Sequence, residues 1–342
     1  MPLFAQEPRR PAIIWVDRGD AAALDLMSGP GGTGRGPGVD FTFVKESPAG
    51  TSPKFDVEDE HGTTWKVKLG EEAKSETAAT RLLWAAGYLV DEDYYLPTMR
   101  VRGLMPLTRG QEFVSNEGTV AGARLERDKS QAARTWSWYD NPFVGSREFN
   151  GLRVMMALVN NWDLKAANND ATGTLIGGEQ YGIADLGATF GRTGNALTRS
   201  KGVLKDYQEA RFIERVTPTY VDFGMHSRPF FLAIFDLHNY WFRTHMQSVV
   251  KHIPLADARW IGDRLGRLSS GQIADCFRAA GFSPADVEAY SQVVMQRIAA
   301  LRALGNTAAM LGAARVVQTS RFNYWESGMD LEPMLVPVAA PA

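Results

Sequence analysis

The chain has 342 residues, a formal net charge of −2 at pH 7 and a single cysteine, Cys276. The near-neutral charge gives no general reason to expect nucleic acid or an anionic membrane as a partner, and one cysteine excludes an internal disulfide framework and a cysteine-based metal site. No uninterrupted apolar run reaches the roughly 18 residues that a membrane span requires, so we expect no transmembrane segment. A chain of this length can bury a substantial core and is expected to form two lobes or domains.

The N-terminal 40 residues are rich in Pro and Gly and are expected to form an N-terminal extension. Within them, SGPGGTGRGPG (28–38) lacks the Gly-Lys-Ser/Thr ending of a Walker sequence, which favours a surface loop over a phosphate loop. MPLFAQEPRRP, at the start of the chain, lacks the apolar core of a signal peptide. We therefore expect a cytoplasmic protein, with a periplasmic or secreted protein after removal of a signal peptide as the alternative.

Residues 41–127 have the pattern of a small antiparallel sheet with one helix. Apolar and polar residues alternate in DFTFVKE, KFDVEDE and TTWKVKLG, which predicts three strands joined by short turns. KSETAATRLLWAAGYL then has apolar residues at helical spacing, with Ser75 as the expected N-cap and Gly87 near the end. YYLPTMRVRGL and GTVAGARLERD are expected to be further strands. The first domain is therefore predicted to be α+β.

Residues 128–342 are predicted to be mainly helical. GSREFNGLRVMMALVNN (145–161) is expected to be a helix, and GTLIG (173–177) and QYGIADLG (180–187) are expected to be short strands. The remainder is expected to be helical, including segments 229–242, 269–282 and 283–304. In the last of these, Ser283 is the expected cap and Pro284 the first helical residue.

The segment NNWDLKAANND (160–170) is either a plain polar loop or a site for a metal ion and a phosphate. Transfer of the terminal phosphoryl group of ATP requires a carboxylate that accepts a proton, oxygen ligands for Mg²⁺, and a lysine on the phosphates that is held by an acid. The chain supplies these groups in the order strand lysine, helix glutamate, loop after a helix, and strand-end aspartate: Lys68, Glu76, Asp163 with Lys165 and Asn168, and Asp185.

In this order and context, the motifs resemble those of the protein-kinase-like superfamily. WKVK resembles its third-strand V-A-I-K, WDLKAAN its catalytic loop H-R-D-L-K-x-x-N, and DLG its metal-binding D-F-G. The resemblance covers roughly residues 41–190. It implies a two-lobed fold with a small antiparallel-sheet N-lobe carrying one helix (41–127) and a mainly helical C-lobe (128–342), with ATP and Mg²⁺, or Mn²⁺, as cofactors.

The resemblance also implies a role for each matching residue. Asp163 would be the catalytic base and Lys165 would neutralise the transferring phosphate, while Asn168 and Asp185 would bind the metal. Lys68 would contact the α- and β-phosphates and pair with Glu76. The turn ESPAGTSP (46–53) would replace the glycine-rich lid, and the residues expected to cover the phosphates there are Ser47, Gly50, Thr51 and Ser52.

Several departures narrow the resemblance to atypical branches. Asn161-Trp162 replaces the His-Arg of the catalytic loop, Leu186 replaces the phenylalanine of D-F-G, and no A-P-E follows. The chain looks more like phosphatidylinositol kinases, HipA-type kinases and secretory-pathway kinases. The expected function is transfer of the γ-phosphoryl of Mg-ATP to a hydroxyl of a small molecule, sugar, lipid or protein. A nucleotide-binding pseudokinase scaffold, an AMP transferase on the same fold and a non-kinase binding module remain alternatives.

Overall fold

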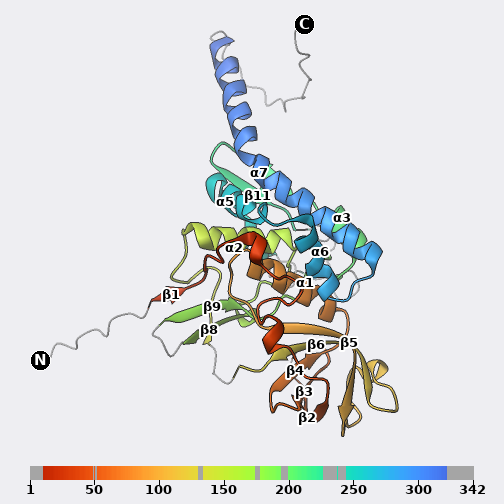
Figure 1. Cartoon of the computed structure of the whole chain (residues 1–342). Coiled ribbons are helices and arrows are strands. Elements are labelled where there is room, and N and C mark those ends of the chain that lie inside the picture. The colour runs from red at the N-terminus through yellow and green to blue at the C-terminus, as the bar shows by residue number, and fades with distance from the viewer. Residues whose placement is uncertain are drawn as a thin grey trace, which may run out of the picture.

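The computed structural model describes residues 11–321 except residues 49, 51, 130–133, 174–177, 194–198, 226–236 and 238–243, with side chains described as far as residue 304. Strands and helices are mixed throughout this range, so the α+β expectation is confirmed. Figure 1 shows a strand-rich part at the bottom of the view and a helix-rich part above it, with α1 between them. No helix in the described range is long and apolar enough to cross a membrane.

The strand-rich part is a closed barrel in which the strands follow the order β2-β3-β4-β6-β5. Their bounds are β2 (Phe41–Ser47), β3 (Lys54–Asp59), β4 (Thr64–Lys68), β5 (Asp93–Arg102) and β6 (Thr119–Arg127). The five predicted strands are confirmed, but the expectation of a purely antiparallel sheet is wrong because β2 and β5 close the barrel as a parallel pair. The barrel interior is apolar and includes Phe55, Val57, Trp65, Val67 and Leu125.

The helix α1 (Glu72–Ala85) follows β4 after a short turn. The expectation that Ser75 is its N-cap is wrong, because the helix begins at Glu72 and Ser75 lies buried in its first turn. The cause is the turn at Gly70, where a φ of +89° and a hydrogen bond from the Ala73 N–H to the Gly70 carbonyl start the helix early. Gly87 ends this region with a φ of +105°, as predicted.

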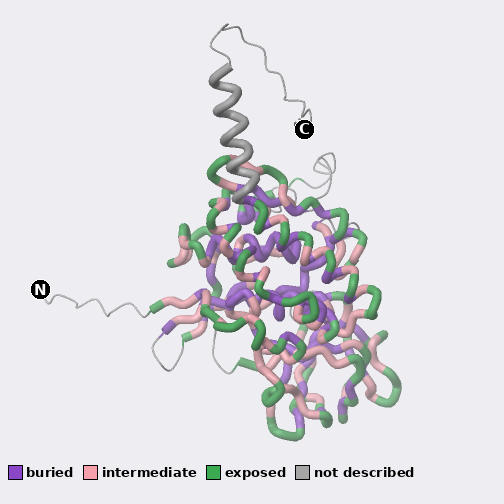
Figure 2. Tube along the Cα trace, turned by 45° about the horizontal axis from the view of Figure 1, so that its top comes forward, coloured by how far each residue is buried: buried purple, intermediate pink, exposed green. Residues whose placement is uncertain are grey.

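The helix-rich part shares one continuous core with α1 and the segment before the barrel. Its helices are α2 (Arg147–Leu158), α3 (Leu204–Glu209), α5 (Leu255–Leu265), α6 (Ser270–Ala279) and α7 (Pro284–Arg321). Ser146 caps α2. Ser283 caps α7 and Pro284 is its first residue, as predicted. Figure 2 shows buried chain running through the middle of this part and exposed chain around it.

A small sheet, β1-β9-β8-β7, lies beside the barrel. The D-L-K-x-x-N motif comes directly before β8, and D-L-G follows the end of β9. It comprises β1 (Ala12–Ile13), β7 (Arg134–Thr135), β8 (Asn169–Gly173) and β9 (Glu179–Ile183). The N-terminal extension therefore contributes a strand, and Trp15 in it donates an indole hydrogen bond of 2.8 Å to the Ala86 carbonyl. The strand expected at 173–177 is placed differently, because β8 ends at Gly173 and residues 174–177 lie outside the described range.

A second small sheet contradicts the expectation that the chain beyond residue 187 is helical. It consists of β10 (Ile213–Val216), β11 (Tyr220–Phe223) and β12 (Ile253–Pro254), paired antiparallel. The local cause is a run of β-branched and aromatic residues on both sides of the turn at Thr217-Pro218. The helix expected at 229–242 lies outside the described residues, apart from Leu237.

Candidate active site

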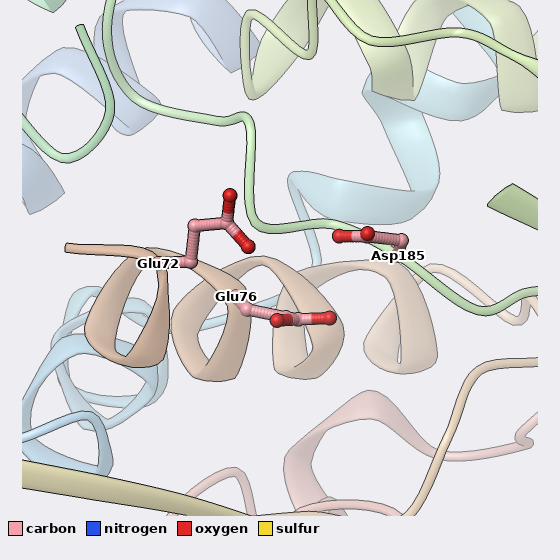
Figure 3. A group of neighbouring side chains, drawn as sticks. All are labelled: Glu72, Glu76 and Asp185. Carbon is pink, nitrogen blue, oxygen red and sulfur yellow. The ribbon is translucent and has the colours of Figure 1, made fainter. Parts of the chain in front are cut away.

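Lys68, the last residue of β4, is the centre of a buried ionic cluster. Its side chain is 5% exposed, and its Nζ lies 2.7 Å from Oε2 of Glu76, 3.1 Å from Oε2 of Glu72 and 3.4 Å from Oδ1 of Asp185. Figure 3 shows Glu72 and Glu76 extending from one side of α1, with Asp185 on the segment that passes beside that side. Acidic side chains from α1 and from the segment after β9 thus surround the ammonium group of Lys68.

The charged groups of this cluster shift one another's pKa values. Burial alone would lower the pKa of Lys68, but Glu76 and Asp185 outweigh it and raise that pKa above its usual range. Burial would raise the pKa of Glu72, but the ammonium groups of Lys68 and Lys201 outweigh it and lower the pKa of Glu72 to about 2. The pKa of Asp185 is also lowered, because Lys68 outweighs burial. Lys68, Glu72 and Asp185 are therefore held in their charged forms at neutral pH, whereas burial outweighs Arg124 and Lys68 and raises the pKa of Glu76 to about 7.

Glu76 divides its two carboxylate oxygens between two cations. Oε2 binds Lys68, while Oε1 lies 3.2 Å from a guanidinium nitrogen of Arg124 on β6. Arg124 is 2% exposed and also binds Asp93 at 3.2 Å and Glu126 at 3.0 Å. A carboxylate gripped on both oxygens cannot rotate away from the lysine, so Arg124 fixes the direction of the pair.

The D-L-G segment is fastened to α1 by its backbone. The Leu186 N–H donates to Glu76 Oε1 at 3.4 Å, and the Ser75 hydroxyl donates to the Gly187 carbonyl at 3.1 Å. The Gly187 N–H donates to Oδ1 of Asp185 at 3.0 Å, which orients that carboxylate. A Cβ at Gly187 would lie 2.7 Å from Oε2 of Glu72, so only glycine permits this close approach.

The segment 160–168 forms a tight polar loop after α2. Asn160 has a φ of +53°, and the Asn161 Oδ1 accepts a hydrogen bond of 3.0 Å from the Asp163 N–H. The Nζ of Lys165 lies 2.8 Å from Oδ1 of Asp163. Asn168 closes the loop, because its Nδ2 donates to the Asp163 carbonyl at 2.7 Å. The three residues of the D-L-K-x-x-N motif therefore lie side by side.

The same loop is joined to the D-L-G strand end and to the segment that follows it. The Asn168 carbonyl accepts hydrogen bonds from the N–H groups of Ala184 at 2.9 Å and Asp185 at 3.3 Å, so Asn168 and Asp185 are neighbours. Trp162, which precedes Asp163, is 4% exposed and donates from its indole to the Ser200 carbonyl at 3.1 Å. This tryptophan therefore connects the loop to Ser200, and its backbone N–H connects it to the Ala188 carbonyl at 3.3 Å.

The donor set of Asn168 and Asp185 fits Mg²⁺ or Mn²⁺. Because the Asn168 Nδ2 is used to bind Asp163, its amide oxygen points the other way, and carboxylate and amide oxygens are the ligands that Mg²⁺ prefers. A second group of acids, Glu72, Glu76 and Asp185, has oxygen atoms within 4.8 Å of one another. Lys68 Nζ already lies among those three carboxylates, so a cation there would have to displace it.

The residues expected to form the lid, Ser47, Gly50, Thr51 and Ser52, differ in how they relate to the ionic cluster. The Ser52 side chain is close enough to Glu72 to help lower the pKa of that carboxyl, and the Ser47 and Gly50 carbonyls accept hydrogen bonds from Arg109 at 3.3 Å and 2.6 Å. Thr51 lies outside the described residues. Ser52 thus approaches the cluster, whereas the side-chain hydrogen bonds to the Ser47 and Gly50 carbonyls come from Arg109.

Several residues of the site were not predicted from the sequence. Glu72, Arg124 and Lys201 all contact the Lys68–Glu76 pair or its immediate partners. For Glu72 a signal was present, because it is four residues before Glu76 and therefore on the same face of the helix. For Arg124 and Lys201 the contacts depend on strand register and on a long connection, which no local pattern reveals.

Comparison with known proteins gives a structural likeness but no family. No protein-family model and no curated protein matches the chain. Among solved structures, it is similar to the crystal structure of the Helicobacter pylori proinflammatory kinase CtkA, with 13% sequence identity and a TM-score of 0.45. The similarity covers 80% of this chain and 99% of that one. At this level of similarity, the chemistry of the site has to be inferred from its own residues.

The position of Glu72 predicts an acid-sensitive fold. Because the pKa of Glu72 is lowered from 4.5 to about 2, its carboxylate stabilises the native state fully above pH 4.5, and this contribution disappears as the pH falls through 2. At about 1.4 kcal/mol per pKa unit, Glu72→Gln is expected to lower the free energy of unfolding at pH 7 by roughly 3 kcal/mol. Urea unfolding at pH 7 and near pH 2 measures this difference, which should shrink at the lower pH.

The exposed neighbour Glu71 provides the control for that measurement, since it precedes α1 and makes no ion pair with a described residue. Glu71→Gln should leave the free energy of unfolding within about 0.5 kcal/mol of the unchanged protein. Equal losses in the two variants, or a Glu72→Gln loss that does not depend on pH, would contradict the assigned ion pairs.

Proposed function

We propose that this chain is an atypical kinase with a two-lobed protein-kinase-like fold, which transfers the γ-phosphoryl group of ATP to a hydroxyl acceptor. Residues 41–127 would form the N-lobe and residues 128–342 the C-lobe. The observation that carries the proposal is the convergence of Lys68, Glu76 and Asp185 in one ionic cluster, with Asn168 hydrogen-bonded to the backbone of Asp185. Two stretches far apart in the sequence, 68–76 and 168–185, supply these groups, and phosphoryl transfer needs this combination.

The roles of the residues follow from their positions. Lys68, held by Glu76, would bind the α- and β-phosphates, and Asn168 and Asp185 would hold Mg²⁺ or Mn²⁺ by their oxygens. When bound, the ion supplies positive charge that neutralises the phosphate oxygens. The acceptor hydroxyl attacks the γ-phosphorus, the bond from that phosphorus to the oxygen of the leaving ADP breaks, and Asp163 takes the hydroxyl proton. Lys165 lies beside Asp163, where it can neutralise charge on the transferring group.

The function is tested with ATP labelled in its γ-phosphate, incubated with metabolite pools and cell extract. Asp163→Asn should reduce transfer of label by about a hundredfold or more, because it removes the proton acceptor while keeping the shape of the side chain. Asp140→Asn changes an exposed aspartate in the segment before α2 and should leave transfer unchanged. Equal transfer in the Asp163→Asn variant would contradict the proposal.

The form of the product separates the remaining alternatives. A parallel incubation uses ATP labelled in its α-phosphate. Transfer of that label, without transfer of the γ-label, would identify an AMP transferase. Mg²⁺-dependent ATP binding without any turnover would identify a pseudokinase, and a chain that shows neither would be a binding module of another kind. The acceptor class is read from the labelled product itself.

A further inference from the structure

Three cations stand in one row across the barrel, on the same face as the candidate active site. In the strand register, Lys54 on β3 is opposite Lys68 on β4, and Lys68 is opposite Arg124 on β6. Directly opposite residues on neighbouring antiparallel strands have Cβ atoms about 5 Å apart on the same face, where like charges destabilise the sheet. Ser47 on β2 is opposite Lys54 and ends the row.

Two of these cations are neutralised and the third is not. Lys68 binds Glu72, Glu76 and Asp185, and Arg124 binds Glu76, Asp93 and Glu126. Lys54 forms no ion pair with any residue in the described part of the chain, although it is half-buried. Burial and then the charge of Lys68 lower its pKa, against the opposing effect of Asp185, Glu76 and Glu72. An ammonium group in such surroundings favours an additional anion.

The surroundings of Lys54 also fix where that anion would lie. Lys54 is the first residue after the turn at 46–53, and its Nζ is 3.6 Å from the position that a Cβ would take on Gly50. Arg109 holds this turn in place by donating to the carbonyls of Gly50 and Ser47. The ammonium group of Lys54 therefore lies close to Gly50. It is on the same side of the sheet as Lys68, within the electrostatic influence of Asp185.

We propose that Lys54 binds the phosphate chain of a nucleoside triphosphate together with Lys68, so that the site favours a triphosphate over the corresponding diphosphate. This inference rests on the proposed function and names the nucleotide form that the site selects. Lys68 is already held by three carboxylates, whereas Lys54 has no ion pair with a described residue and can direct its ammonium at phosphate oxygens. A ligand with more negative charge gains more from this group, and an ammonium offers three hydrogen-bond donors to phosphate oxygens.

The test compares the affinities of the full chain for Mg-ATP and Mg-ADP by calorimetry. Lys54→Met is expected to weaken Mg-ATP binding roughly ten- to a hundredfold, the usual loss for a charge-assisted hydrogen bond, and to weaken Mg-ADP binding less. Lys54→Arg keeps the charge and should retain most of the preference for ATP. Lys45→Met is the control, because Lys45 lies on β2 with a 70% exposed side chain, 3.6 Å from Asp56, and should change neither affinity.

Thermal unfolding without nucleotide separates a binding role from a structural one. Lys54→Met should not lower the melting temperature of the nucleotide-free protein, because it removes repulsion from Lys68, yet Mg-ATP should raise that temperature less than in the unchanged chain. Unchanged ATP affinity in Lys54→Met, or a lower melting temperature without nucleotide, would overturn the role of Lys54 alone. An unaltered chain that does not bind Mg-ATP would overturn the proposed function and this inference with it.

Discussion

Replacing Asp185 with alanine is expected to reduce Mg-ATP turnover on the order of a thousandfold while leaving the protein folded. The change removes the carboxylate that is proposed to bind the metal ion and that lies 3.4 Å from the Nζ of Lys68. The fold should survive because the side chain is 34% exposed and Lys68 keeps Glu72 and Glu76. Turnover of ATP at saturating Mg²⁺, with circular dichroism of the same samples, measures both halves of the prediction.

Asp263→Ala is the matched control for this variant, since Asp263 is half-exposed on α5 and its ion pairs are with Arg259 and Arg302. It should turn over ATP at the unaltered rate. If Asp185→Ala retained full activity, the metal assignment would be wrong. If it lost activity only because it unfolded, the carboxylate would have a structural role instead.

The second large effect is expected from the Lys68–Glu76 pair. Lys68→Ala leaves three carboxylates without their shared cation, one of them 1% exposed, and is expected to destabilise the fold by about 3–5 kcal/mol and to weaken Mg-ATP binding. Glu76→Gln leaves Lys68 and Arg124 each short of one partner and is expected to cost less, because both keep other acids.

The double variant should be clearly non-additive, with a coupling energy of about 1–3 kcal/mol, because each single change already breaks the same contact. The free energies of unfolding of the four proteins in urea give this coupling. A pair of distant changes, Lys68→Ala with Asp263→Ala, should add within about 0.5 kcal/mol. Strictly additive losses for Lys68 and Glu76 would show that the two side chains do not stabilise each other as an ion pair.

The parts of the fold that sequence could predict are those set by local patterns. Alternation in KFDVEDE and TTWKVKLG predicted β3 and β4, and the spacing of apolar residues predicted α1 and α2. The helix start at Glu72 was missed because it depends on where β4 turns, and not on which residue is the better cap. The parallel closure of the barrel by β2 and β5 was missed because pairing between distant strands leaves no local trace.

The candidate site divides in the same way. Lys68, Glu76, Asp163, Asn168 and Asp185 were found by their order along the chain, a property of the sequence itself. Arg124 and Lys54 act through their positions opposite Lys68, which only strand register determines. Neither residue stands out in the sequence, because Arg124 belongs to a strand much further along the chain and Lys54 follows a turn.

The most direct test of the whole account is the position of a bound metal ion in crystals grown with Mn²⁺ and a non-hydrolysable ATP analogue. The account predicts an anomalous scattering peak about 2–2.5 Å from both the Asn168 amide oxygen and the Asp185 carboxylate, with phosphate oxygens on the same ion and on Lys68. A peak elsewhere, or a nucleotide bound away from Lys68, would contradict it.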